Sequence, residues 1–225
     1  EQRFRQAQVT KMMECPLCEH EDATLFATVQ KKEYASCGNC SLVFMIPAFF
    51  LDSRSEKERY LQHNNDPNDE KYRAFLFRLA ERVFPHVSCG DIGLDYGSGP
   101  APVLSMLFEE KKGINLVPFD KYFQPDMDLL SSQYDFVTCS ETAEHFRSPK
   151  EDWSILHRIT KPGGILAIMT GQLTAEDAAS FSKWWYVRDP THVCFYRRQT
   201  MVWIAGHWNM EVEFCEQNVV LFRKR

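Results

Sequence analysis

The sequence lacks a long apolar run, an apolar signal core near its start, an excess of positive charge and any internal repeat. Its longest apolar stretch, residues 42–51, is short and contains Pro47, whereas a membrane-spanning helix needs roughly 20 consecutive apolar residues. The N-terminal extension, residues 1–13, is polar, so we expect no membrane span, no secretion and a cytoplasmic location. Met12 or Met13 is a candidate native start, in which case the preceding residues carry no fold information.

Positive charge is the second shortage. The 225 residues include 26 Lys plus Arg against 31 Asp plus Glu, for a formal net charge of -5. This is the wrong sign for a protein that depends on neutralising phosphates, so nucleic acid is a disfavoured partner, although a local basic patch is compatible with it. Hydrophobic residues make up 44% and charged residues 25%, which indicates a globular chain with one main domain and a small appendage.

Cysteine, in contrast, is plentiful. Four of the eight cysteines form two CxxC pairs, Cys15 with Cys18 and Cys37 with Cys40. Two such pairs supply the closed tetrahedral set of thiolates that zinc prefers in structural sites, and the short strands expected around them bury too little to fold without the ion. Residues 14–45 are therefore predicted to form a zinc ribbon with a structural zinc. Two redox dithiols are the alternative, but redox CxxC motifs normally occur singly beside a βαβ unit.

Residues 46–89 are expected to connect the ribbon to the rest of the chain. Turn-forming residues dominate the first part of this connector. Apolar residues then recur at helical spacing from Tyr72 to Val83, with Asn68 as the candidate N-cap and Pro85 as the residue that stops the helix.

Strands and helices alternate from residue 90 to residue 225, which is typical of an α/β sheet. The segment between Asp120 and Tyr134 is too short for a full strand and helix. The predicted strands are 92–96, 114–119, 134–139, 165–170 and, as a terminal antiparallel pair, 211–214 and 219–223.

A glycine-rich turn, residues 97–101, follows the first of these strands. Glycines between a strand and a helix let the backbone approach a ligand closely, and an acid one strand later can accept hydrogen bonds from ribose hydroxyls. Asp120 has that position. Because Ala101 replaces the third glycine of the dinucleotide fingerprint, the turn alone indicates a nucleotide-type cofactor without identifying it.

Taken together, these segments resemble the class I S-adenosylmethionine-dependent methyltransferases over residues 90–225. The similarity lies in LDYGSGPAP (94–102), FD (119–120), YDFVTCSETAEHF (134–146), LHRITKPGGILAI (156–168) and the closing strand pair. The resemblance implies an α/β, Rossmann-like sheet, methyl transfer and S-adenosylmethionine as the cofactor. It assigns to cofactor binding Asp95, Gly97, Ser98, Gly99, Asp120, Ser140 and Glu141. The adenine-contacting acid is less clear because of the short segment after Asp120, and Asp128 is a candidate.

A second group of polar residues suits the chemistry of the methyl acceptor: Glu141, Glu144, His145 and the later His192. If a helical turn begins after Ser140, the first three share one face at the carboxyl edge of the sheet. Such a set suits a divalent cation that lowers the pKa of a bound hydroxyl, and it resembles the pattern of metal-dependent O-methyltransferases of small RNA and of the ubiquinone pathway. Alternatively, the ExxEH segment is structural or faces the cofactor, and His145 or His192 is then the natural general base.

Aromatic residues cluster around His192. They either wall an apolar substrate pocket or pack in the core: Trp184, Trp185, Tyr186, Phe195 and Tyr196. Arg188 either pairs with Asp189 or holds a substrate carboxylate or phosphate.

Three functions remain open. The net charge favours a small-molecule methyltransferase acting on an O or C nucleophile, by analogy with ribbon-bearing sugar C-methyltransferases and ubiquinone-type O-methyltransferases. An RNA methyltransferase that uses the ribbon for recognition is the second, and it requires a basic surface near residues 54–82. The third is a non-catalytic scaffold that keeps the methyltransferase fold but has no affinity for the cofactor.

Overall fold

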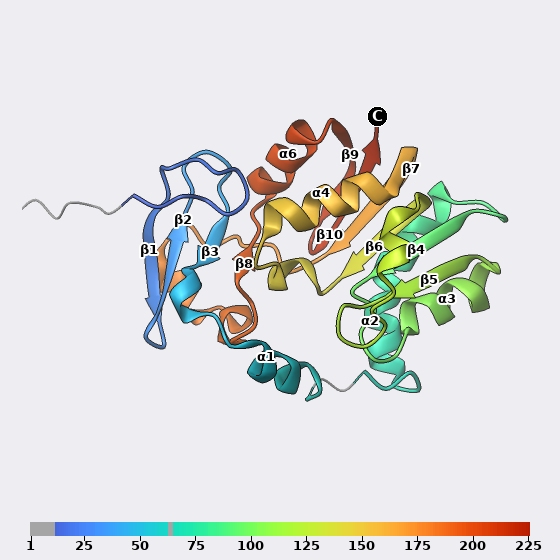
Figure 1. Ribbon diagram of the computed structural model, residues 1–225, viewed down its shortest axis with the longest axis horizontal. Coiled ribbons are helices and arrows are strands. Elements are labelled where there is room, and N and C mark those ends of the chain that lie inside the picture. Colours follow the sequence, from blue (N-terminus) through green and yellow to red (C-terminus); the bar gives the residue numbers. More distant parts are fainter. Residues whose placement is uncertain (1–11, 63–64) are drawn as a thin grey trace, which may run out of the picture.

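The computed structural model describes residues 12–62 and 65–225, so the predicted N-terminal extension lies almost wholly outside the described residues. Two sheets organise the chain: a four-stranded sheet in the N-terminal part and a six-stranded sheet covered by helices (Figure 1). None of the helices in the described ranges combines the length and the apolar character that crossing a bilayer requires.

The smaller sheet contains the strands expected for the ribbon, β1 (Thr24–Val29), β2 (Lys32–Ser36) and β3 (Val43–Met45). All its neighbours pair antiparallel, in the order β1-β2-β3-β8. The fourth strand, β8 (Cys194–Phe195), comes from a distant part of the sequence and lies beside the blue ribbon strands in Figure 1. The ribbon sheet is thus completed by a segment from the range predicted for the methyltransferase domain.

The larger sheet has the strand order β5-β4-β6-β7-β10-β9. The first four strands in this order are parallel, and β10 and β9 form the antiparallel end, which confirms the predicted Rossmann-like sheet with a closing strand pair. Only the 3-10 helix η3 (Met127–Ser131) separates β5 from β6, as the short spacing predicts. The strands are β4 (Ile92–Tyr96), β5 (Asn115–Phe119), β6 (Tyr134–Ser140), β7 (Thr160–Met169), β9 (Met210–Glu216) and β10 (Val219–Lys224).

Helices cover both faces of this sheet because successive residues of its central strands point to opposite sides. Ile165 and Ala167 of β7 share one apolar cluster with helices α2 and α3, whereas Leu166 and Ile168 belong to the cluster that contains α4 and α6. The helices are α2 (Glu70–Val83), α3 (Val103–Lys112), α4 (Pro149–Ile159) and α6 (Arg198–His207).

Two local features differ from the sequence-based expectation. The N-cap of α2 is Asp69, whose carboxylate accepts hydrogen bonds from the amides of Lys71 and Tyr72, so the prediction of Asn68 is wrong by one residue. The connector also contains the helix α1 (Ser53–Tyr60), which the sequence does not predict. The remaining short elements are η1 (Pro47–Phe49), η2 (Phe84–His86), η4 (Ala143–His145), α5 (Ala178–Lys183) and η5 (Trp185–Arg188).

Candidate active site and cysteine cluster

A cavity with a volume of about 730 Å³ opens at the carboxyl ends of β4, β5 and β6. Ligands bind in this crevice in open α/β sheets. The glycine-rich turn after β4, Asp120 after β5 and Ser140 at the end of β6 form one side of it. Side chains from α1, α2 and η5 form the other side, so the connector and the segment before β8 complete a site that the sheet begins.

The glycine-rich turn and Asp120 are fixed to each other. Gly97 and Gly99 have φ values of 86° and 69°, which residues with a side chain rarely adopt. In addition, a Cβ atom on Gly97 would overlap the side chain of Thr142. Asp120 Oδ2 accepts a hydrogen bond from the Gly99 amide at 3.0 Å, and Oδ1 accepts one from the Tyr122 amide at 2.8 Å. The turn and the acid therefore present one preformed surface to a ligand.

Of the residues assigned to the cofactor, Asp95 alone does not line the cavity. It lies behind the turn, where Thr138 Oγ1 donates a hydrogen bond of 2.7 Å to its Oδ1, and burial raises its pKa to about 7. Asp128, the candidate for adenine, is exposed in η3 and does not line the cavity either. The assigned residues that do line it are Gly97, Ser98, Gly99, Asp120, Ser140 and Glu141.

The acceptor-side residues gather only in part. One ligand atom from each of Glu144, His145 and His192 lies within 4.8 Å of the others. Glu141 is not part of this group. It precedes η4 and has a left-handed backbone conformation, with a φ of 47°. The expectation that Glu141 shares a helical face with Glu144 and His145 is therefore wrong. Glu141 still lines the cavity, where burial and the charge of Glu144 raise its pKa.

Backbone carbonyls orient both imidazoles. His145 Nδ1 lies 2.9 Å from the Thr191 carbonyl oxygen, and His192 Nδ1 lies 2.8 Å from that of Tyr186. A carbonyl oxygen only accepts, so each Nδ1 carries a proton and a neutral ring has its lone pair on Nε2. Burial lowers the pKa of His192 to about 4, so this ring is neutral at pH 7.

Glu144 is fully buried, and its two carboxylate oxygens differ. Oε2 accepts a hydrogen bond from Thr170 Oγ1 at 2.7 Å, whereas Oε1 is buried without a hydrogen-bond partner. Among the described residues only four side-chain polar atoms are buried in this way, and three belong to cavity-lining residues: Ser98 Oγ, Ser140 Oγ and Glu144 Oε1. Such orphaned atoms are expected where a ligand binds. One carboxylate oxygen and two imidazole nitrogens fit a divalent cation that keeps open positions.

Helix α1 supplies cavity residues that the sequence analysis missed. Tyr60 packs edge-on against the His145 ring with 5.1 Å between centroids. The helix is held by Glu56, its one buried residue, which pairs with Arg147 at 2.6 Å and Lys121 at 3.4 Å. Because α1 has no apolar stripe, periodicity alone cannot find it; the N-cap Asp52 is its clearest signal.

The aromatic cluster divides between the two predicted roles. Trp185 and Tyr186 line the cavity, and the Tyr186 ring lies 4.1 Å from that of His192, whereas Phe195 and Tyr196 are core residues. Arg188 also lines the cavity and is exposed. Of the two alternatives for Arg188, the pair with Asp189 is not found among the described residues, where Asp189 pairs with Arg59 at 2.7 Å.

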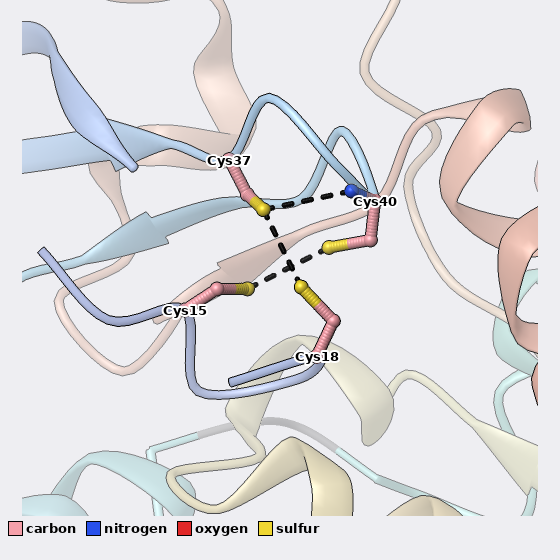
Figure 2. A group of neighbouring side chains, drawn as sticks. All are labelled: Cys15, Cys18, Cys37 and Cys40. Atoms are coloured by element: carbon pink, nitrogen blue, oxygen red, sulfur yellow. Dashed lines mark hydrogen bonds between the residues drawn. The ribbon is translucent and has the colours of Figure 1, made fainter. Parts of the chain in front are cut away.

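The four ribbon cysteines converge on one point (Figure 2). Their sulfur atoms all lie within 4.8 Å of one another, with 3.5 Å between Cys15 and Cys40 and 3.5 Å between Cys18 and Cys37. Tetrahedral zinc with Zn–S bonds of about 2.3 Å separates its sulfurs by about 3.8 Å, so the cluster matches such a site closely. A hydrogen bond with Cys40 lowers the pKa of Cys15 to about 6, whereas the same hydrogen bond raises the pKa of Cys40 and burial raises that of Cys37 to about 12.

Comparison with known proteins agrees with this geometry. Residues 68–213 match the family model described as methyltransferase domain. The chain belongs to this family. Within it, a 72-residue region is 33% identical to the ubiquinone biosynthesis O-methyltransferase of Erwinia tasmaniensis, covering 32% of this chain and 29% of that relative. The match therefore spans less than a third of the relative's length.

Solved structures show the same fold for the methyltransferase domain. A 1,6-didemethyltoxoflavin-N1-methyltransferase from Burkholderia thailandensis, with bound 1,6-didemethyltoxoflavin and S-adenosylhomocysteine, has a TM-score of 0.55 at 11% identity and covers 87% of this chain and 96% of its own. A SAM-dependent methyltransferase from Archaeoglobus fulgidus has a TM-score of 0.51 at 16% identity, covering 77% and 100%. The fold is thus that of the class I S-adenosylmethionine-dependent methyltransferases.

Proposed function

We propose that the protein transfers the methyl group of S-adenosylmethionine to an oxygen atom of a small molecule. One observation carries this proposal: the glycine-rich turn and the cluster of Glu144, His145 and His192 face the same cavity. The first suits a cofactor that contains a nucleoside, and the second suits activation of a hydroxyl group.

Cofactor binding is assigned to the turn and to Asp120. Asp120 is positioned to accept hydrogen bonds from ribose hydroxyls, and the orphaned hydroxyls of Ser98 and Ser140 offer further polar contacts. The toxoflavin methyltransferase binds S-adenosylhomocysteine on the same fold, which supports the assignment. Asp95 is buried behind the turn and does not line the cavity, so we assign it a structural role rather than a contact with the cofactor.

We assign activation of the acceptor hydroxyl to the cluster of Glu144, His145 and His192. Glu144 Oε1 and the two Nε2 atoms would hold a divalent cation, which when bound lowers the pKa of a hydroxyl group. The hydroxyl proton leaves to bulk water, and the deprotonated oxygen then forms the new bond to the methyl carbon while the carbon–sulfur bond breaks and its electron pair returns to sulfur. The protein must mainly align these atoms and exclude water.

The cysteine cluster is proposed to hold a structural zinc. Its four thiolates fill every position of a tetrahedral site, so no position is left for a substrate. We accordingly propose three parts for the chain: a ribbon over residues 14–45, a connector over 46–89 and the methyltransferase domain over 90–225.

An RNA acceptor is less well supported. It requires a basic surface near residues 54–82, but acidic side chains engage several arginines of that segment. These ion pairs are Arg54 with Glu58, Arg59 with Asp189, and Arg73 with Glu110. Together with the net charge of -5, they favour a small molecule.

Calorimetry with S-adenosylmethionine and S-adenosylhomocysteine, with elemental analysis of the same protein, tests the proposal. We expect cofactor binding with a Kd on the order of micromolar, its loss in Asp120→Ala, and normal binding in His192→Ala. Asp128→Ala is the matched control, since this exposed acid does not line the cavity. A folded chain that binds neither compound refutes the proposed function and leaves the scaffold hypothesis.

A further inference from the structure

The ribbon reaches the acceptor side of the cavity through its strand β3. Val43 and Phe44 pair with Phe195 and Cys194 of β8. The ladder extends one residue further, because the amide of Met45 donates a hydrogen bond of 2.8 Å to the carbonyl of Val193. The ribbon therefore binds the backbone directly after His192.

Val193 in turn connects the ribbon to Glu144 through backbone hydrogen bonds. Its own amide donates a hydrogen bond of 2.8 Å to the Glu144 carbonyl, and Cys194 Sγ donates one of 3.2 Å to the Phe146 carbonyl. Two residues before Val193, the Thr191 carbonyl orients the His145 ring. The short segment 191–194 thus contacts residues 144–146 at three points and carries His192 itself.

Aromatic packing joins the ribbon to the same segment. Phe181 of α5 lies edge-on against Phe195 of β8 at 5.1 Å and against Tyr34 of β2 at 5.2 Å, and Tyr34 contacts Phe195 at 5.7 Å. These rings are buried in an apolar core that also includes Leu94 of β4 and Phe119 of β5, so the direct ring contacts, and not the shared core, single out β8 as the neighbour of the ribbon. A shift of the ribbon would therefore move β8.

The cofactor side is held differently. Its turn is fixed by bonds from the Gly97 amide to the Phe119 carbonyl and from the Gly99 amide to Asp120. Strands β4 and β5 lie at the opposite end of the large sheet from its antiparallel pair, and within the described residues no backbone bond links them to the ribbon.

We propose that the cysteine ribbon positions the acceptor-activating residues. Strand β3 holds residues 193–195, and these hold Glu144, His145 and His192 in their mutual arrangement. Met45 and Val193 are then positioning residues, and an ion on the four cysteines acts on the acceptor half of the cavity and leaves the cofactor half unchanged. This inference rests on the proposed function for the role of the cluster.

Hydrogen–deuterium exchange on the full chain, zinc-loaded and after removal of zinc by a chelator, tests this positioning. We expect exchange in residues 193–195 and 144–146 to rise about tenfold or more after zinc removal, while exchange in β4 stays unchanged. The affinity for S-adenosylhomocysteine should stay within about threefold, and added zinc should restore the original exchange. Imidazole nitrogen shifts should show that His145 and His192 lose their Nδ1-protonated form.

Two variants separate this effect from general damage. Cys18→Ser should reproduce zinc removal, whereas Cys89→Ser, which changes an exposed cysteine outside the ribbon, should not. Met45→Pro keeps all four cysteines and removes the amide that bonds Val193, so it tests the connection without relying on zinc. Met45→Ala, which loses the same buried side chain but keeps the amide, is its matched control.

The outcomes are distinct. Unchanged exchange in residues 193–195 after zinc loss and in Met45→Pro overturns the proposal. An equal rise in β4, with loss of S-adenosylhomocysteine binding, overturns it too, because the ribbon would then stabilise the whole chain. If zinc-loaded wild-type protein binds no S-adenosylhomocysteine, the proposed function fails, while the exchange data still decide whether the ribbon positions this segment.

Discussion

The cysteine cluster and the Glu144 cluster are both suited to a metal ion, yet they are built in opposite ways. The cysteine cluster has four candidate ligands of one kind, drawn from the two CxxC pairs, and none of them lines the cavity. The Glu144 cluster has three ligands of two kinds and lies in the cavity wall. Four protein ligands close a tetrahedral site, whereas three leave room for water or substrate.

We expect the cysteine cluster to contribute to the stability of the protein and the Glu144 cluster to contribute to catalysis. The ribbon strands alone bury little, so an ion on the cysteines is expected to contribute to folding. The Glu144 cluster sits among elements that are already packed, so an ion there is expected to contribute to turnover. Each region should therefore respond to a different measurement.

The largest effect should follow removal of a buried ribbon ligand. Cys15→Ser should lower the free energy of unfolding of the ribbon, residues 14–45, by about 3–5 kcal/mol and release zinc, because structural zinc binding is itself folding free energy. Urea unfolding and elemental analysis measure both. Cys215→Ser is the control, since this residue lies in β9 outside the cluster. A zinc-free variant as stable as the wild type would remove the contrast between the two clusters.

Glu144→Gln should impair the Glu144 cluster and therefore affect turnover more than stability. The amide keeps an acceptor for Thr170 but loses the charge at Oε1, so we expect turnover to fall about 10²–10⁴-fold with little change in stability or S-adenosylhomocysteine affinity. Glu151→Gln, another cavity-lining acid outside the cluster, is the control. Full turnover by Glu144→Gln would instead support a structural role for the ExxEH segment.

Asp95 sharpens the comparison because it is a buried acid that belongs to neither cluster. Burial raises its pKa from 3.8 to about 7, so between these values the folded chain holds a proton that the unfolded chain has released. Stability from this group is therefore lost as the pH rises toward 7. Asp95→Asn should be more stable than the wild type by about 4 kcal/mol at pH 8 and nearly equal at pH 4, in urea unfolding. An equal difference at both pH values would contradict this account.

Local sequence signals predicted the elements that depend on local causes. Strand 92–96 was predicted with its observed bounds, because the glycine-rich turn directly after Tyr96 marks its end. The two CxxC pairs predicted a convergence of four thiols, because their spacing is a property of short turns.

Features set by distant contacts could not be predicted in this way. Helix α1 has no apolar stripe, and its buried Glu56 is paired with Arg147 and Lys121 far along the chain, in addition to its hydrogen bond from Tyr60 in the same helix. The two-residue strand β8 exists because β3 pairs with it. Glu141 does not share the expected helical face, because its backbone adopts the left-handed conformation, and residue spacing alone does not reveal this.

Arg188 offers the smallest expected effect and the most direct information on the acceptor. It is exposed in the cavity wall, Asp189 is engaged by Arg59, and the described part of the chain offers Arg188 no ion-pair partner. Three residues apart on the 3-10 helix η5, Arg188 and the exposed Trp185 share one face, which would place a cation beside an aromatic surface.

Arg188→Gln should raise the KM about tenfold for acceptors that carry a carboxylate or phosphate and leave neutral acceptors unchanged, with kcat preserved in both cases. Steady-state kinetics on matched anionic and neutral phenols measures this difference. Lys183→Gln removes an exposed charge outside the cavity and is the control. An equal loss for both kinds of phenol would mean that Arg188 shapes the wall without reading charge. A selective loss would show that Arg188 in the cavity wall recognises the charge of the acceptor.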